Sequence, residues 1–216
     1  MPRTADPATV PGLPESRLSP ADLARLPAAS PAAPWRCRAT AVAWLQRARH
    51  PAFDWGATPL PIAFVVVVDY EDTPVGPYHE VVAAAALRRG RRVLGQVPFI
   101  AVDSLPSVHG GRSNWALPKT TATFTGGARN RAVTVRGDGW SLTARTARTG
   151  PRLPLRVSMW NTGPLGDYRV HLRATGRPVI VDASAVGATL TPWLGAGRHL
   201  GMTLTGELLV EAPQPD

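Results

Sequence analysis

The chain has almost no lysine. Lys119 is the only one, so 23 of the 24 Lys and Arg residues are arginines. There is also a single cysteine, Cys37, which excludes an internal disulfide and favours a reducing compartment. The longest wholly apolar runs, 62–68 and 81–87, are far too short for a transmembrane helix, which needs about 20 residues. Residues 1–34 contain no apolar stretch typical of a secretory signal, so we expect a cytoplasmic protein without membrane contact.

The net charge of +9 raises the question of nucleic-acid binding. The arginines are spread along the whole chain, and the only dense group is Arg88-Arg89-Gly90-Arg91-Arg92. This group lies between two apolar runs, which is typical of a solvated hairpin tip, so we expect no nucleic-acid partner. The five histidines are scattered without paired spacing, and we therefore expect neither a metal site nor a cofactor.

Residues 1–34 form a Pro- and Ala-rich segment with few large apolar side chains. Such a segment cannot bury enough surface to fold alone. Ser19-Pro20-Ala21-Asp22 has the pattern of a helix start, with a capping serine, proline at the first helical position and an acid three residues after the cap. We interpret the segment as an extended tail with one short helix; the alternative is a lid or an oligomer contact.

From Trp35 onward the pattern predicts a single, mainly β domain that spans residues 35–216. Short runs rich in Val, Thr and Trp recur between Gly and Pro residues. Many strands and few helices indicate a β-barrel or sandwich. Residues 183–200 are expected to hold one short helix. The predicted strands are 36–46, 62–69, 79–87, 92–102, 119–125, 131–136, 140–146, 153–160, 167–174, 178–182 and 201–211.

A lysine kept in this arginine-rich chain suggests chemistry that arginine cannot perform. Arg stays protonated at any working pH, whereas a buried Lys can lose its proton and become a nucleophilic amine. The functional interpretation is a Schiff-base lysine that attacks a ketone or aldehyde carbon; the alternative is an ordinary surface cation. Glu80 starts an apolar run and could face Lys119 to shuttle protons. It could equally pair with one of the many arginines.

Two motifs resemble the acetoacetate decarboxylase family. One is Asp103-Ser104, then Gly111-Arg112, then five residues, then Pro118-Lys119; the other, upstream, is Gly76-Pro77-Tyr78-His79-Glu80. In that family the lysine of Pro-Lys forms the Schiff base, and the glutamate of Tyr-x-Glu lies in the active site. The resemblance implies that Lys119 is the nucleophile and Glu80 the acid/base or orienting group. It also implies an antiparallel, cone-shaped β-barrel with few short helices, and assembly into homo-oligomers.

The chain departs from the family decarboxylases at two places. Thr120 stands where they carry a second lysine, and Val65 stands where they carry a second glutamate. A family arginine near the N-terminal strand corresponds to Arg36 or Arg38, with the register left open. Because Val65 replaces a charged residue, acetoacetate itself is not the expected substrate.

We therefore predict a carbon–carbon lyase of this superfamily that acts on a small keto acid. The imine chemistry can be decarboxylation or a related aldol or dehydration reaction, and relatives of this kind often act on secondary metabolites. Arg38 or Arg112 could grip the substrate carboxylate, although Arg112 is better explained by ordering the loop before Lys119. Trp115 and Val65 are expected to line the site and favour the neutral amine. The alternative is a non-catalytic β-barrel that binds a small molecule and keeps a vestigial lysine.

Overall fold

The computed structural model describes residues 4–48, 57–148 and 150–214, and strands dominate them. None of the helices in these ranges has the length and hydropathy to cross a membrane. In chain order the elements are η1 (Pro14–Ser16), α1 (Pro20–Ala24), β1 (Trp35–Arg47), β2 (Thr58–Asp72), β3 (Tyr78–Arg89), β4 (Arg92–Val102), α2 (Leu105–Trp115), β5 (Lys119–Thr121), β6 (Thr123–Gly126), β7 (Ala132–Gly137), β8 (Trp140–Arg148), β9 (Leu153–Gly163), β10 (Gly166–Val186), α3 (Leu190–Leu194) and β11 (Ala196–Val210).

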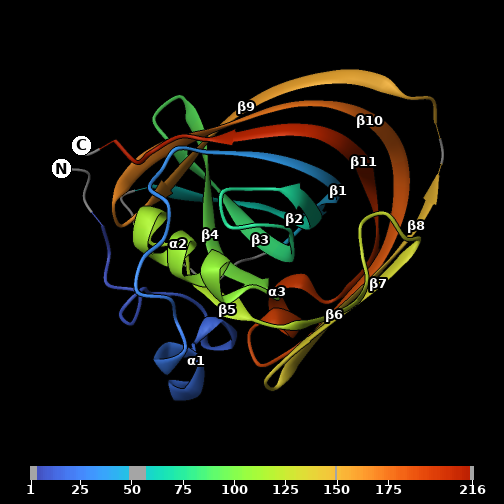
Figure 1. The fold of residues 1–216 in the computed structure, drawn as a ribbon. Coiled ribbons are helices and arrows are strands. Elements are labelled where there is room, and N and C mark those ends of the chain that lie inside the picture. Colours follow the sequence, from blue (N-terminus) through green and yellow to red (C-terminus); the bar gives the residue numbers. More distant parts are fainter. Residues whose placement is uncertain (1–3, 49–56, 149, 215–216) are drawn as a thin grey trace.

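Seven of these strands close into a ring. Their order is β11-β1-β2-β3-β4-β9-β10, and a further pairing of β10 with β11 joins the two ends. The long strand β10 continues beyond the ring and pairs with β8, which carries β7 and β6 (Figure 1). Most neighbours run antiparallel, whereas β4 pairs in parallel with both β5 and β9. The prediction of a mainly β, barrel-like fold is confirmed.

The predicted hairpin tip at Arg88–Arg92 is confirmed by backbone geometry, and a second tight turn follows the same rule. Gly90 joins β3 to β4 with φ of 59°, so the Arg88–Arg92 group does lie at a hairpin tip. Gly139 joins β7 to β8 with φ of 71°. Glycine adopts these left-handed values without the clash that a Cβ would cause, and both turns therefore follow directly from the sequence.

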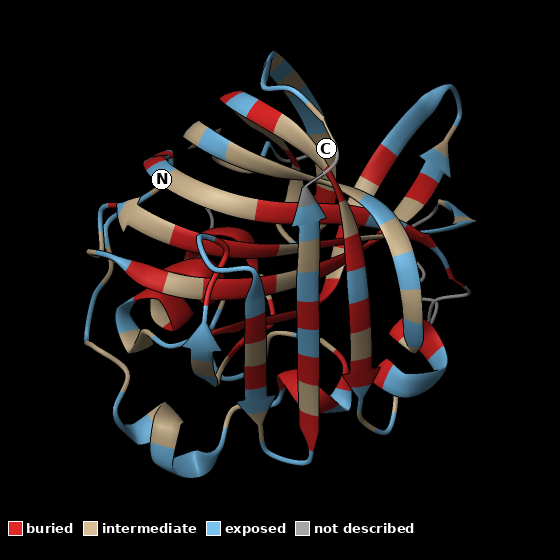
Figure 2. Cartoon of the chain, turned by 90° about the vertical axis from the view of Figure 1, so that its right-hand side faces the viewer, coloured by how far each residue is buried: buried red, intermediate tan, exposed pale blue. Residues whose placement is uncertain are grey.

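The buried side of the sheet changes from one face to the other along the strands. In β1, Trp35 and Cys37 are buried near one end, whereas Val42 and Trp44 are buried near the other. Alternate residues of a strand point to opposite faces, so these two pairs face different cores. The bands of buried and exposed residues that result are visible in Figure 2. The larger core packs β1–β4 against β7, β8 and α3, and the smaller one surrounds Trp115 at the end of α2.

The structure corrects the sequence prediction at three elements. The predicted strand 119–125 is two strands, β5 and β6, interrupted at Ala122. Helix α2 was not predicted, because Gly110 and Gly111 were interpreted as part of a loop before Lys119. Strand β10 is continuous, whereas two strands, 167–174 and 178–182, were expected on either side of Gly176 and Pro178. Proline has no N–H to donate to a sheet, yet here it lies inside β10.

The N-terminal segment is extended with one short helix, but it is attached to the barrel rather than free. Ser19 caps α1 by accepting a hydrogen bond from the backbone N–H of Asp22, as its pattern predicts. The N–H of Leu13 donates to the carbonyl of Pro98 in β4 at 3.0 Å. The Glu15 carboxylate accepts from the N–H of Thr189 at 2.7 Å. These hydrogen bonds join the segment to strands and loops that are distant in the chain. They explain how a segment with few large apolar side chains is held against the barrel.

Candidate active site

Lys119 is placed by the end of α2 and the start of β5. The helix ends at Ala116, which takes a left-handed conformation with φ of 51° and turns the chain back. Pro118 follows, and Lys119 then pairs with Ile100 of β4. Its side chain is buried, with a relative exposure of 4% for the residue. The only lysine of the protein is therefore not a surface cation.

The Lys119 ammonium has three polar neighbours. Its Nζ lies 2.7 Å from Oε2 of Glu80 and 2.9 Å from Oγ of Ser107. The hydroxyl of Tyr78 is 3.5 Å from the same nitrogen, which also lies 5.1 Å from the centre of the Tyr78 ring. An ammonium has three hydrogens to donate, so this set satisfies it fully in a buried place. The Glu80 carboxylate and the face of the Tyr78 ring are both partners that attract a cation.

Glu80 is held on its other side by a second tyrosine. It projects from β3 and is 5% exposed. The hydroxyl of Tyr70, on β2, donates to Oε1 of Glu80 at 3.3 Å. The two tyrosine rings lie against each other with centroids 4.5 Å apart. The carboxylate thus accepts from Lys119 with one oxygen and from Tyr70 with the other.

Burial and the Glu80 charge keep the neighbouring tyrosine hydroxyls and the Cys37 thiol protonated. Desolvation, followed by the charge of Glu80, raises the pKa of Tyr70 and of Tyr78 well above the ordinary value. The same two causes raise the pKa of the Cys37 thiol to about 12. These groups are therefore neutral hydrogen-bond donors at neutral pH, and Glu80 is the proton acceptor nearest to Lys119.

Gly110 and Gly111 lie in α2 at positions where neighbouring side chains pack too closely to leave room for a Cβ. A Cβ on Gly110 would lie 2.5 Å from the ring of Trp35. A Cβ on Gly111 would lie 2.5 Å from Cδ and 2.6 Å from Cε of Lys119. Gly111 therefore makes room for the lysine side chain to lie across the helix and reach Glu80.

Gly111→Ala is expected to displace the Lys119 amine from Glu80 and to slow its reaction with carbonyl compounds at least tenfold. An alanine normally stabilises a helix by up to about 1 kcal/mol relative to glycine, so a lower stability here would report the clash. The measurement is the rate of reductive trapping, described below, together with urea unfolding. Gly163→Ala is the matched control, because its Cβ would meet only the Trp115 carbonyl oxygen, at 3.4 Å. Equal trapping rates in the two variants would contradict this role for Gly111.

Arg112 orders the backbone around Lys119. Its Nε donates to the carbonyl of Lys119 at 2.6 Å, Nη1 to that of Pro7 at 2.7 Å and Nη2 to that of Ser16 at 2.9 Å. Burial lowers the pKa of Arg112 to about 10, which leaves it positively charged at neutral pH. Each nitrogen of the guanidinium is engaged with a carbonyl. This geometry favours the loop-ordering interpretation over carboxylate binding.

The remaining predicted site residues are Trp115, Val65 and Arg38. Trp115 belongs to the same end of the barrel: it packs edge-on against Trp35 with centroids 5.2 Å apart and donates to the carbonyl of Glu211. Val65 lies elsewhere. It pairs with Ala83, whereas Val68 pairs with Glu80, so Val65 points to the opposite face from Glu80 and into the larger core.

Arg38 is also on the wrong face for direct contact with Lys119. Its side chain is 59% exposed and pairs with Glu71 at 3.3 Å. Cys37, the residue before it, faces the smaller core instead. Cys37 is near enough to Glu80 and Lys119 for their charges to act on its thiol. The structure therefore brings Glu80 and Arg112 to Lys119, and leaves Val65 and Arg38 apart from it.

Sequence reasoning missed Ser107, Tyr70 and Tyr78. Tyr78 could have been found, because it precedes Glu80 by two residues and so shares its face of the strand. Ser107 could not, since it reaches Lys119 only from the unpredicted helix α2. In the described ranges no three His, Cys, Asp or Glu side chains are grouped so that they could hold a metal ion. The chemistry that the described side chains offer is that of an amine, a carboxylate and hydroxyls.

A family model described as acetoacetate decarboxylase (ADC) matches residues 53–167, which is more than half of the chain and includes both Glu80 and Lys119. The chain belongs to the acetoacetate decarboxylase family. No curated protein sequence gives a significant match. Membership thus rests on the family model, and the solved structures add the fold.

Several solved structures share the fold at low sequence identity. Acetoacetate decarboxylase from Legionella pneumophila subsp. pneumophila str. Philadelphia 1 has a TM-score of 0.59 and 13% identity, over 85% of this chain and 86% of that one. An acetoacetate decarboxylase-like enzyme from Sphingomonas wittichii RW1 has a TM-score of 0.55 and 16% identity, over 85% and 93%. The enduracididine biosynthesis enzyme MppR complexed with pyruvate has a TM-score of 0.55 and 14% identity, over 93% and 96%.

Proposed function

We propose that this family member is a Schiff-base-forming lyase that acts on a small keto acid through Lys119. The observation that carries the proposal is the buried contact between the only lysine and Glu80, at 2.7 Å. A lysine that serves merely as a cation would not need burial or a proton acceptor of its own. An amine that must become neutral before it attacks needs both.

The geometry supports a defined set of roles. Glu80 takes a proton from the Lys119 ammonium, and the freed amine attacks the ketone carbon. The carbinolamine that forms loses water, with its hydroxyl protonated by Glu80, and leaves a protonated imine on Lys119. This imine accepts the electron pair of the carbon–carbon bond that breaks. In this proposal Glu80 moves the protons, and Ser107 and Tyr78 hold the nitrogen in position.

The same imine serves several reactions, and decarboxylation is one of them. It can equally acidify the α-carbon for aldol or dehydration chemistry. Two solved structures with this fold are of MppR, one with pyruvate and one with the condensation product of pyruvate and imidazole 4-carboxaldehyde. These ligands belong to MppR, but they illustrate that this fold accommodates keto acids other than acetoacetate. Thr120, where the decarboxylases carry a second lysine, favours such a substrate here.

The competing proposal is a non-catalytic barrel that binds a small molecule and keeps a vestigial lysine. One observation favours it. Lys119 and Glu80 form a closed pair, and neither lines the open pocket across β1, β11, β10 and β9 or the small cavity beside Trp115. A catalytic site of this kind must open to admit its substrate, whereas a vestigial pair can remain closed.

Reductive trapping separates the two proposals. The protein is mixed with acetoacetate, pyruvate and other 2- and 3-keto acids, treated with borohydride and examined by intact and peptide mass. Because Lys119 is the only lysine, the N-terminal amine is the only other amine that can react. We expect an adduct on the Lys119 peptide, and its mass shows whether carbon dioxide has left.

The control is the Lys119→Met variant, treated in the same way. It is expected to give no adduct apart from any on the N-terminal peptide. If none of the carbonyl compounds gives an adduct on Lys119 of the unmodified protein, the non-catalytic barrel is favoured. Cytoplasmic location and assembly into a homo-oligomer stay predictions of the sequence.

A further inference from the structure

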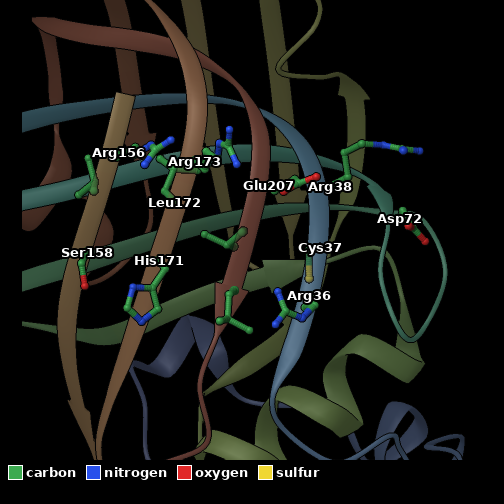
Figure 3. Close-up of a pocket in the computed structure, with 13 residues that line it drawn as sticks. Arg36, Cys37, Arg38, Asp72, Arg156, Ser158, His171, Leu172, Arg173 and Glu207 are labelled. Carbon is green, nitrogen blue, oxygen red and sulfur yellow. The ribbon is translucent and has the colours of Figure 1, made fainter. Parts of the chain in front are cut away.

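An open pocket of about 660 Å³ crosses strands β1, β11, β10 and β9 (Figure 3). The strand register explains its wall. Arg38 lies opposite Glu207, Glu207 opposite Arg173, and Arg173 opposite Arg156, so these four side chains form one row across four strands. Arg36, also in the wall, is one step along β1 on the same face. We call this site the arginine pocket.

Of the four arginines in the wall of this pocket, only Arg38 has an ion pair among the described residues. In the described part of the chain, Arg36, Arg156 and Arg173 have no ion pair, whereas Arg38 pairs with Glu71. Arg156 and Arg173 also face each other directly across antiparallel strands. Like charges in this position repel and destabilise a sheet. An anion bound between them would remove the repulsion.

The arginine pocket is separate from the Lys119 amine. Arg36 and Arg38 flank Cys37 in β1 and so point to the opposite face. Cys37 lies in the smaller core with Trp35 and Trp115, on the side where the charges of Glu80 and Lys119 reach it. The arginine pocket and the Lys119 amine therefore lie on opposite faces of β1. A ligand in the pocket cannot form an imine with Lys119.

We propose that the arginine pocket binds a small hydroxylated organic anion through its carboxylate or phosphate group. Guanidinium groups match both kinds of anion with paired, charge-assisted hydrogen bonds. Glu207 and Asp72 lie in the same wall and can accept hydrogen bonds from hydroxyl groups of the ligand. These acids would repel the continuous phosphate backbone of a nucleic acid. The volume lies within the range of about 300–1,000 Å³ that is usual for small-molecule sites.

Calorimetric titration tests this proposal, with citrate as the carboxylate probe and glucose 6-phosphate and inorganic phosphate as the phosphate probes. We expect saturable binding of at least one probe at a single site. Arg156→Gln and Arg173→Gln should each weaken it about tenfold or more, because each removes a charge-assisted hydrogen bond. The probe that binds more tightly identifies carboxylate or phosphate as the preferred group.

Arg91→Gln is the matched control, because Arg91 is exposed in the turn between β3 and β4 and the charge change is the same. It should leave the dissociation constant within about twofold. Lys119→Met should also bind normally, so failure of the imine chemistry and failure of this site are distinguishable. Equal weakening in all three arginine variants, or no saturable binding of any probe, would overturn the proposal. So would self-association that only Arg156→Gln and Arg173→Gln abolish, since the pocket would then be a subunit interface.

Discussion

Replacing Lys119 with methionine is expected to lower the free energy of unfolding by about 3–5 kcal/mol, because it leaves the Glu80 carboxylate buried without its cation. Both side chains are almost inaccessible, at 5% and 6% exposure. Without Lys119, the Glu80 carboxylate keeps the hydrogen bond from the Tyr70 hydroxyl, at 3.3 Å. Urea unfolding at pH 7 measures the loss.

The double variant Lys119→Met/Glu80→Leu should recover most of that stability. Replacing both members of a buried ion pair by apolar residues is often neutral, whereas removing one member is not. The cycle is completed by Glu80→Leu alone, which leaves the ammonium without its carboxylate. Strong non-additivity would show that the two side chains are coupled. Recovery of stability in the double variant would show that the fold does not need the pair, so that chemistry is the better explanation for it. Additive losses in the double variant would argue that the two side chains do not act as a unit.

The strands and turns of this protein could be predicted because they follow from local rules. Val-rich runs and glycine turns fix β3, β4, β7 and β8 without reference to the rest of the chain. The switch of the buried face could not be predicted, because it depends on which elements cover each end of the sheet. Val65 illustrates the problem. It is as apolar as a site-lining residue should be, but the register of β2 against β3 turns it towards the other core.

The candidate site was predictable where sequence spacing and strand geometry agree. Lys119 was singled out by its rarity, and Glu80 by its place after Tyr78; the structure brings the two together. Ser107 lies in a stretch with Pro106, Gly110 and Gly111, whose composition indicates a loop. Only the contacts of the two glycines with Trp35 and Lys119 show why they are compatible with a helix. Such contacts between segments distant in the chain leave no local signal.

Arg112 illustrates the opposite case, in which a residue was found but its role had two interpretations. A guanidinium next to a proposed amine can bind a substrate carboxylate or order the backbone. The sequence alone could not decide, because the carbonyls of Pro7 and Ser16 come from a segment that was expected to be free. In the structure these carbonyls and that of Lys119 occupy all three nitrogens. The N-terminal segment is thereby tied to the strand that carries the amine.

Arg112→Met is therefore expected to destabilise the protein by about 3–5 kcal/mol. Methionine keeps much of the apolar stem but donates no hydrogen bonds, and each buried carbonyl left without a partner costs about 1–3 kcal/mol. Arg112→Lys should restore less than half of the loss, because one ammonium cannot span three carbonyls in the geometry of a guanidinium. Urea unfolding measures both variants. Arg129→Met, at an exposed arginine paired with Glu71, is the matched control and should change stability by less than about 1 kcal/mol.

Limited tryptic digestion distinguishes a local from a global effect of the same change. Arg17 and Arg25 lie in the N-terminal segment, and the Arg17 carbonyl accepts a hydrogen bond from Thr120, next to Lys119. If Arg112 ties the segment to β5, Arg112→Met should be cut at these arginines much faster than the Arg129→Met control, under conditions where both remain folded. Slower trapping at Lys119 should accompany the faster cleavage, because the loop that positions the amine has lost its support. Unchanged cleavage and unchanged trapping in a destabilised Arg112→Met would instead mean that Arg112 stabilises the fold without ordering the site.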